Sequence, residues 1–203
     1  MRRPTETLRI AGVILAAGAS RRMGGKNKML LELEGETLVR RAAKRALGAG
    51  LRPVVVVIGH EADRLRAELK DLSLEVVVNP DYSGPTSGSL HHGLNLLGAD
   101  VDAVIVMLAD MVRVTAETLA MLMAAARGTD APLVVSRYGD VTAPPVLFRR
   151  ALFAELLAWT GEGCGKAVVR AHQHEAMYVD RPVTLLTDVD TPQDFAAAKN
   201  AEW

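Results

Sequence analysis

The stretch Val13-Ile-Leu-Ala-Ala-Gly-Ala-Ser-Arg-Arg-Met-Gly-Gly-Lys-Asn-Lys28 joins an apolar strand to a turn of small residues that ends in cations. Residues 16–20 carry almost no side chain, so backbone N–H groups there can approach a ligand without steric hindrance. The positive charge that follows comes from Arg21, Arg22, Lys26 and Lys28. Backbone donors next to cations suit the anionic oxygens of a triphosphate. A surface loop of solvated cations is the alternative, and it is disfavoured because the loop follows an apolar strand near the N-terminus.

The composition restricts the class of protein. The chain has 203 residues, of which 49% are hydrophobic and only 4% aromatic, which indicates a single α/β domain with an aliphatic core. Lys plus Arg and Asp plus Glu both number 24, so no global field attracts nucleic acid or an anionic membrane. Any site for a polyanion must therefore be local.

The remaining compositional features concern redox chemistry and location. Cys164 is the only cysteine, which excludes an intramolecular disulfide and a thiolate metal cluster. The basic N-terminus is not followed by the apolar segment of a signal peptide, and no run of about 18 apolar residues could cross a membrane. We therefore expect a cytoplasmic protein with no membrane partner.

Apolar strands and helical patterns alternate along the chain. The predicted strands are 8–16, 53–58, 74–78, 102–108, 133–136, 146–148, 177–179 and 183–186. The predicted helices are 37–47, 61–70, 90–97 (entered through 86–89), 115–126, 149–159, 166–172 and a last helix capped by Thr191. Such alternation predicts a doubly wound, mostly parallel sheet with helices on both faces. We expect one domain, residues 1–203, with a nucleotide-binding half at 1–112 and an acceptor-side half at 113–203.

The pattern Leu15-Ala-Ala-Gly-x-Ser-x-Arg-Met-Gly-x-x-Lys28 resembles the signature of the nucleotidyltransferases related to molybdenum-cofactor cytidylyltransferase. The resemblance continues to Asp188-Val-Asp-Thr-Pro-Gln-Asp194 and so spans nearly the whole chain. It implies a Rossmann-like nucleotidyltransferase fold and magnesium-dependent transfer of a nucleotide to a phosphorylated acceptor, with release of pyrophosphate. It also implies that Arg22 and Lys28 are the catalytic cations, whereas Arg21, Lys26 and Asn27 are solvated or secondary. The implied nucleotide-binding residues of this loop are Leu15, Ala16, Ala17, Gly18 and Ser20.

A second loop, Asn79-Pro-Asp-Tyr-Ser-Gly-Pro-Thr-Ser-Gly-Ser-Leu90, introduces a helix with several hydroxyls. The amides of a helix N-terminus attract an anion or polar ring atoms, although a simple helix cap explains the same residues. The resemblance favours contacts to the base and sugar of the nucleotide through Gly84, Ser87 and Ser89.

Carboxylates at two places predict a metal site. Asp110 follows a buried strand, where it could bind Mg²⁺ together with phosphate oxygens and water, or cap a turn. Asp188 and Asp190 lie two apart on an extended segment and therefore point the same way. The resemblance implies that Asp190 is the second magnesium ligand and that Asp188 supports it. The alternative for Asp190 is a helix cap, because Thr191-Pro192 follows.

The resemblance also bears on both substrates. Ala16-Ala17-Gly18 resembles cytidylyl enzymes, whereas guanylyl relatives usually carry Gly at the second position, which leaves room for a purine; CTP is therefore the expected nucleotide. The implied acceptor is molybdopterin with molybdenum bound. Val112 stands where the family usually has Pro, and Ala143-Pro144 where relatives commonly have Gly-His. A sugar or alditol phosphate acceptor therefore stays open, as does a non-catalytic chaperone that delivers cofactor to a molybdenum hydroxylase apoenzyme.

Other motifs are interpreted as structural. Gly161-Glu-Gly-Cys-Gly-Lys166 is one residue short of a phosphate-binding loop and lacks its Ser or Thr. The pairs His91-His92 and His172/His174 lack a third ligand and are expected on the surface or in loops. Cys164 has no indicated base that would make it a nucleophile. A third set is expected to pack in the core: Met107, Met111, Met121 and Met123.

Overall fold

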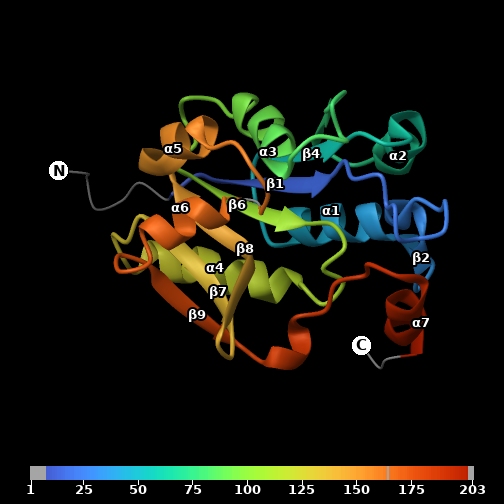
Figure 1. The fold of residues 1–203 in the computed structure, drawn as a ribbon. Helices are drawn as coiled ribbons and strands as arrows, with labels where there is room; N and C mark the ends of the chain where they lie inside the picture. The colour runs from blue at the N-terminus through green and yellow to red at the C-terminus, as the bar shows by residue number, and fades with distance from the viewer. Residues whose placement is uncertain (1–7, 164, 201–203) are drawn as a thin grey trace.

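The computed structural model describes residues 8–163 and 165–200, so Cys164 and both ends of the predicted 1–203 domain lie outside it. A seven-stranded sheet of order β5-β4-β1-β6-β8-β7-β9 runs through the molecule (Figure 1). Its strands are β1 Ile10–Ala16, β4 Val54–Ile58, β5 Glu75–Val78, β6 Ala103–Leu108, β7 Leu133–Tyr138, β8 Val141–Arg149 and β9 Met177–Arg181. All neighbours are parallel except β8, which is antiparallel to both β6 and β7. The predicted mixed α/β fold with a mostly parallel sheet is confirmed.

The centre of the sheet is built from β-branched aliphatic residues. β4 consists of four valines and an isoleucine, all buried. Val13 of β1 pairs with Val55 of β4 on one side and with Val106 of β6 on the other. A strand that is buried on both faces reads as a continuous apolar run, because helices cover the sheet from both sides.

Helices cover both faces of this sheet (Figure 1). The helices are α1 Leu38–Gly48, α2 Ala62–Leu69, α3 Thr86–Asn95, α4 Ala116–Arg127, α5 Phe153–Ala158, α6 Lys166–Ala171 and α7 Pro192–Asn200. Short 3-10 turns lie at η1 Lys28–Leu30, η2 Arg150–Leu152 and η3 Val183–Leu185. Apolar residues of α1, α2 and α4 share one core cluster with the sheet, and those of α3, α5 and α6 share the other. The doubly wound arrangement follows from these two separate cores.

Two strand predictions differ from the structure. A small hairpin, β2 Glu32–Leu33 and β3 Glu36–Thr37, was not predicted; Glu34 and Gly35 make its turn, both with positive φ (54° and 79°). The strand predicted at 183–186 is wrong, because this segment forms the 3-10 turn η3. Val183 is 62% exposed, so its apolar side chain does not pack on a buried face of the sheet.

Further corrections concern extent and burial. The strand predicted at 146–148 extends over β8, Val141–Arg149, and the helix predicted at 149–159 is divided into η2 and α5. Met107, Met111 and Met123 are buried as predicted. The predicted core position of Met121 is wrong, because this residue is 37% exposed and its sulfur accepts a hydrogen bond from Arg181.

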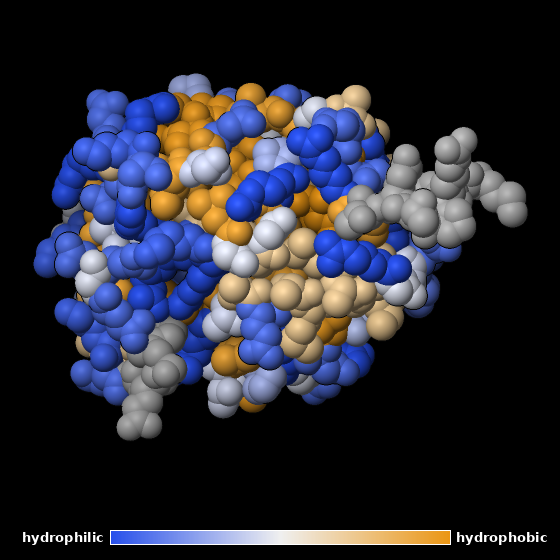
Figure 2. Space-filling model, turned by 180° about the vertical axis from the view of Figure 1, so that it is seen from behind, coloured by the Kyte–Doolittle hydropathy of each residue, from blue (hydrophilic) through white to orange (hydrophobic). Residues whose placement is uncertain are grey.

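The surface behind the view of Figure 1 mixes both kinds of side chain. Figure 2 shows an apolar patch in its upper half, bordered by hydrophilic side chains. Among residues 8–163 and 165–200, no helix has the length and apolar content needed to cross a bilayer.

Helix α3 packs on β1 through a glycine, which gives a stability prediction. A Cβ on Gly93 would lie 2.5 Å from Val13 Cγ1 and 3.1 Å from Val57 Cγ2. We expect Gly93→Ala to lower the free energy of unfolding by about 1–3 kcal/mol, because overpacking outweighs the better helix propensity of alanine. Gly88→Ala on the same helix is the matched control, since its Cβ meets only Asn79 Nδ2, at 3.8 Å. Urea unfolding that shows equal stability for Gly93→Ala and the wild type would contradict this packing.

Candidate active site

The loop after β1 is shaped by its own polar residues. Ser20 has a positive φ of 52°, and its hydroxyl accepts a hydrogen bond from the backbone N–H of Lys28 at 3.0 Å. Asn27 is buried, so the solvated alternative predicted for this residue is wrong, whereas a secondary role in the site stays a prediction. Its side-chain amide donates to the carbonyl of His60 at 3.1 Å and accepts from Met29 N. These contacts bring the end of the loop back to the sheet and fix where the Lys28 side chain begins.

Lys28 lies between two carboxylates. Its ammonium forms an ion pair with Asp110 and a second with Asp190 Oδ1 at 3.0 Å. Arg22 Nη2 pairs with the other oxygen of Asp190 at 2.8 Å. The side chains of Lys28 and Asp110 are only 12% and 13% exposed, whereas that of Arg22 is 69% exposed. The structure thus brings together the two predicted catalytic cations and the two predicted metal ligands.

The segment 188–190 reaches this place because it is pinned to the loop after β6. The backbone of Asp188 forms an isolated antiparallel β-bridge with that of Met111, and Val189 N donates to the carbonyl of Asp110 at 3.2 Å. Val189 is fully buried in a small cluster with Val112, Leu33 and Leu38. Val112, the residue that departs from the family pattern, therefore helps to hold the two carboxylate-bearing segments side by side.

Asp190 does not cap the last helix. Asp194 Oδ2 accepts from Asp190 N at 3.1 Å and from Thr191 N at 2.7 Å, while Asp194 N donates to the Thr191 hydroxyl. This is a reciprocal capping arrangement at the start of α7, with Thr191 as the predicted cap. The Asp190 carboxylate faces Arg22 and Lys28 instead.

Electrostatics in the cluster favour additional positive charge. Burial alone would lower the pKa of Lys28, but Asp110 and Asp190 outweigh it and hold that pKa above its usual value. Burial, reinforced by the charges of Asp110 and Asp190, raises the pKa of Asp188 to about 6. Asp110 and Asp190 are thus paired with Lys28 and Arg22, while the nearby carboxyl of Asp188 is destabilised in its charged form by the other two carboxylates.

The residues of the cluster fit a divalent metal. Asp110 Oδ1 is buried and has no hydrogen-bond partner within residues 8–163 and 165–200. An orphaned buried carboxylate oxygen is costly unless a cation or donor meets it. The part of the chain that the structure describes contains no group of three or more His, Cys, Asp or Glu that could enclose a metal. Mg²⁺ is commonly bound by one or two carboxylates together with substrate phosphates and water, and Asp110 and Asp190 provide two carboxylates that lie against the same ammonium.

The floor of the predicted nucleotide site is tightly packed. Leu15, Ala16 and Ala17 are buried, whereas Gly18 is exposed. The carbonyl of Ala17 accepts a hydrogen bond from His60 N at 3.0 Å. A Cβ on Gly59 would lie 2.8 Å from that carbonyl oxygen and 3.0 Å from the Ala17 methyl group. The end of β4 thus supports the small-residue loop from behind.

Polar groups at the start of α3 form hydrogen bonds with other parts of the protein. Ser87 exchanges two hydrogen bonds with Gly161, each of 3.0 Å, and Thr86 donates through its N–H and hydroxyl to Glu162 Oε2. Ser89 is buried and accepts from Asn79 Nδ2 at 3.0 Å. Gly84 N donates to the carbonyl of Asp81. These residues form the predicted turn, and their role as nucleotide contacts stays a prediction.

The histidine pairs have structural partners. His91 and His92 are half-buried on α3, against the expectation of a surface or loop position, and contact the carbonyls of Leu156 and Gly88. His172 lies between Glu155 and Glu175. These contacts give each of the three rings a partner within the protein.

Comparisons with known proteins agree with this arrangement. The family model described as MobA-like NTP transferase domain matches residues 12–176. A molybdenum cofactor guanylyltransferase of Cereibacter sphaeroides is 30% identical over 194 residues, covering 95% of this chain and 97% of that protein. Nicotine blue oxidoreductase of Paenarthrobacter nicotinovorans is 31% identical over 140 residues, covering 69% of this chain and 67% of that protein.

Among solved structures, the protein Rv0371c of Mycobacterium tuberculosis, crystallised as a complex with manganese, superimposes with a TM-score of 0.82 at 26% identity. The match covers 96% of this chain and all of that one. The family match extends over most of the chain and includes both the loop after β1 and Asp110. The chain therefore belongs to the MobA-like NTP transferase family and is a nucleotidyltransferase.

Proposed function

We propose that this nucleotidyltransferase uses Mg²⁺ to transfer CMP from CTP to a phosphorylated acceptor, the molybdenum cofactor. The observation that carries the proposal is the cluster of Lys28 and Arg22 with Asp110 and Asp190, in which Asp110 Oδ1 lacks a partner among the described residues. Cations for a triphosphate and carboxylates for a metal meet there, close to the carboxyl ends of β1 and β6. Ligands of open α/β sheets bind at that edge.

The proposed reaction is an in-line displacement at phosphorus. An oxygen of the acceptor phosphate forms a bond to the α-phosphorus of the nucleotide. The bond from the α-phosphorus to the bridging oxygen breaks, and pyrophosphate leaves with that electron pair. Lys28 and Arg22 stabilise the charge on the departing oxygens, and Asp110 and Asp190 are the residues that would hold a bound metal. A bound Mg²⁺ supplies further charge neutralisation at the phosphates. No covalent enzyme intermediate is needed, because positioning and charge stabilisation account for the rate.

The choice of base gives a sharp prediction around Ala17. Its buried methyl group fills the space in front of Gly59, and we propose that this leaves too little room for a purine. The wild type should prefer CTP over GTP, and Ala17→Gly should reduce that preference by about tenfold, the effect of one small group in a pocket. The measurement is kcat/KM for each nucleotide.

The control for added backbone freedom is Ala19→Gly, in the same loop, which should keep the preference for CTP. A wild type that uses GTP as well as CTP would contradict the proposed selectivity. Such a result would agree with the guanylyltransferase name of the Cereibacter relative.

The acceptor is proposed from the names of relatives and from the resemblance described above. Its test is product identification after incubation with Mg²⁺, each nucleoside triphosphate, and either molybdenum cofactor or a sugar or alditol phosphate. Nucleotidylated cofactor is the expected product. Exclusive transfer to a sugar phosphate would replace the acceptor, and tight binding of cofactor without pyrophosphate release would indicate the chaperone function.

A further inference from the structure

The two cations of the cluster are paired with the same carboxylates that the proposed function assigns to the metal. Lys28 Nζ contacts Asp110 Oδ2 and Asp190 Oδ1, while Arg22 Nη2 contacts Asp190 Oδ2. Asp190 therefore has both oxygens engaged by cations. Asp110 has one engaged oxygen, and its Oδ1 has no partner among the described residues. A metal ion bound by both carboxylates would have to take an oxygen of Asp190 from Lys28 or Arg22.

A metal ion on these carboxylates would also lie next to the Lys28 ammonium. Oδ1 of Asp110 belongs to the same carboxylate as Oδ2, which the ammonium contacts. A divalent cation on Oδ1 and the ammonium on Oδ2 would repel each other strongly, because the site is shielded from water. The anionic oxygens of a triphosphate offer the ammonium another set of acceptors. The metal and the triphosphate therefore act on Lys28 in the same direction, away from the carboxylates.

Lys28 is a stronger competitor for the carboxylates than Arg22. The side chains of Lys28 and Asp110 are only 12% and 13% exposed, so little water screens their attraction. Arg22 is 69% exposed, and ion pairs in contact with solvent are weak. The backbone N–H of Lys28 is bonded to the Ser20 hydroxyl at 3.0 Å, which limits how far its side chain can withdraw. The competition should therefore depend mainly on Lys28.

We propose that Lys28 competes with the divalent metal for Asp110 and Asp190, and that a bound triphosphate relieves this competition by pairing with the ammonium. The inference rests on the proposed function, because it concerns the metal and the nucleotide of that reaction. It assigns Lys28 a role before catalysis: this residue makes the metal bind weakly until the nucleotide is present. By linkage, the nucleotide strengthens the binding of the metal by the same factor by which the metal strengthens the binding of the nucleotide.

The first test is the binding of Mn²⁺ alone, followed by the electron paramagnetic resonance of the free ion, without nucleotide or acceptor. Lys28→Met keeps an unbranched apolar side chain and removes the charge. We expect this variant to bind Mn²⁺ about tenfold or more tightly than the wild type, which is the size of one charge-assisted contact. Damage to the site would weaken the binding of Mn²⁺ instead, so the direction of the change separates competition from a merely structural role.

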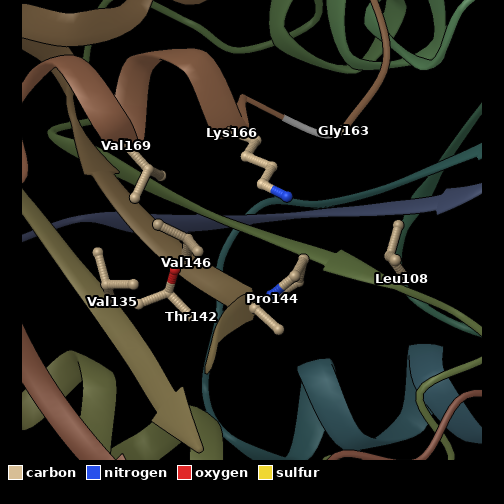
Figure 3. Close-up of a pocket in the computed structure, with 9 residues that line it drawn as sticks. Leu108, Val135, Thr142, Pro144, Val146, Gly163, Lys166 and Val169 are labelled. Carbon is tan, nitrogen blue, oxygen red and sulfur yellow. The ribbon is translucent and has the colours of Figure 1, made fainter. Parts of the chain in front are cut away.

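Lys166 provides the matched control. It lines a hollow together with Leu108, the last residue of β6, and Figure 3 shows its side chain extending from the start of α6 toward Pro144 and Val146. Within residues 8–163 and 165–200, no ion pair or hydrogen bond engages its ammonium. Lys166→Met thus removes the same charge without freeing a carboxylate. It should leave the affinity for Mn²⁺ unchanged.

The second test uses the wild type and needs no variant to fold. Mn²⁺ binding is measured by calorimetry with and without a nucleotide analogue in which a methylene group replaces the oxygen between the α- and β-phosphorus, so that no transfer occurs. The analogues of CTP and of GTP are tested separately, with correction for Mn²⁺ that they bind in solution. We expect the analogue that binds to tighten Mn²⁺ binding about tenfold or more. Lys28→Met should lose most of this coupling, whereas Arg22→Met should keep most of it.

The outcomes separate this inference from the proposed function. Equal or weaker binding of Mn²⁺ by Lys28→Met than by the wild type would overturn the inference. Equal affinity of the wild type for Mn²⁺ with and without either analogue would also overturn it. Neither result concerns nucleotide transfer, which the product analysis decides. Conversely, absence of transfer in the wild type would reject the proposed function, while the binding of Mn²⁺ would still decide whether Lys28 competes with the metal.

Discussion

Replacing Lys28 by Ala is expected to lower kcat for nucleotide transfer by roughly 10²–10³-fold, the usual cost of removing one preorganised group that stabilises developing charge. Lys28 holds Asp110 and Asp190 together, and its raised pKa keeps it charged throughout the neutral range. The measurement is the steady-state release of pyrophosphate from CTP at saturating acceptor and Mg²⁺.

Because Lys28 is only 12% exposed, its removal leaves the Asp110 carboxylate without its cation and also costs stability. Arg22→Ala separates catalysis from stability, since this side chain is 69% exposed. It should lose turnover by orders of magnitude while its thermal unfolding stays close to that of the wild type. Lys26→Ala, an exposed cation of the same loop, is the matched control and should stay active. Full activity of Arg22→Ala and Lys28→Ala would remove this loop from the mechanism.

Asp110→Asn and Asp190→Asn are each expected to lower kcat by orders of magnitude, to a small residual rate, while nucleotide binding without metal persists. Asn keeps the shape of the side chain but removes the charge that a divalent cation requires. The double variant should be little worse than either single one, because residues that act as a unit are not additive. Binding of Mn²⁺ followed by electron paramagnetic resonance gives the second readout, and both variants should lose it.

The control for this pair is Asp63→Asn, an exposed carboxylate on α2, which should retain activity and Mn²⁺ binding. An active Asp190→Asn enzyme would reduce Asp190 to a partner of Arg22. Additive losses in the double variant would indicate that the two carboxylates act separately.

Much of the central sheet could be predicted from the sequence, because β1, β4 and β6 are continuous apolar runs. Their burial on both faces leaves a signal that needs no knowledge of the fold. Val183 shows the limit of that signal: it follows Pro182 and is exposed, so β-branched composition alone overstated its strand character. The Glu34-Gly35 turn carried a usable signal, since a residue pair ending in Gly is typical of two-residue hairpins.

The sequence predicted which residues belong to the candidate site, but it did not predict which of them contact one another. Lys28 and Asp110 stand 82 residues apart, and their ion pair depends on strand order. The bonds of Ser87 to Gly161 and of Thr86 to Glu162 join segments more than 70 residues apart, which no local pattern encodes. Lys166 ends a motif that the sequence analysis interpreted as structural, and the residues that surround it in space come from other strands, which no local pattern encodes.

The most direct test of the central claim is a single reaction with CTP labelled at the α-phosphate, Mg²⁺ and molybdenum cofactor. Labelled product and released pyrophosphate are measured together over time. Transfer by in-line displacement predicts one pyrophosphate for each label transferred. Pyrophosphate release and label transfer should both require the acceptor, and Asp110→Asn should lose both. Binding of CTP with neither pyrophosphate release nor label transfer would contradict the account.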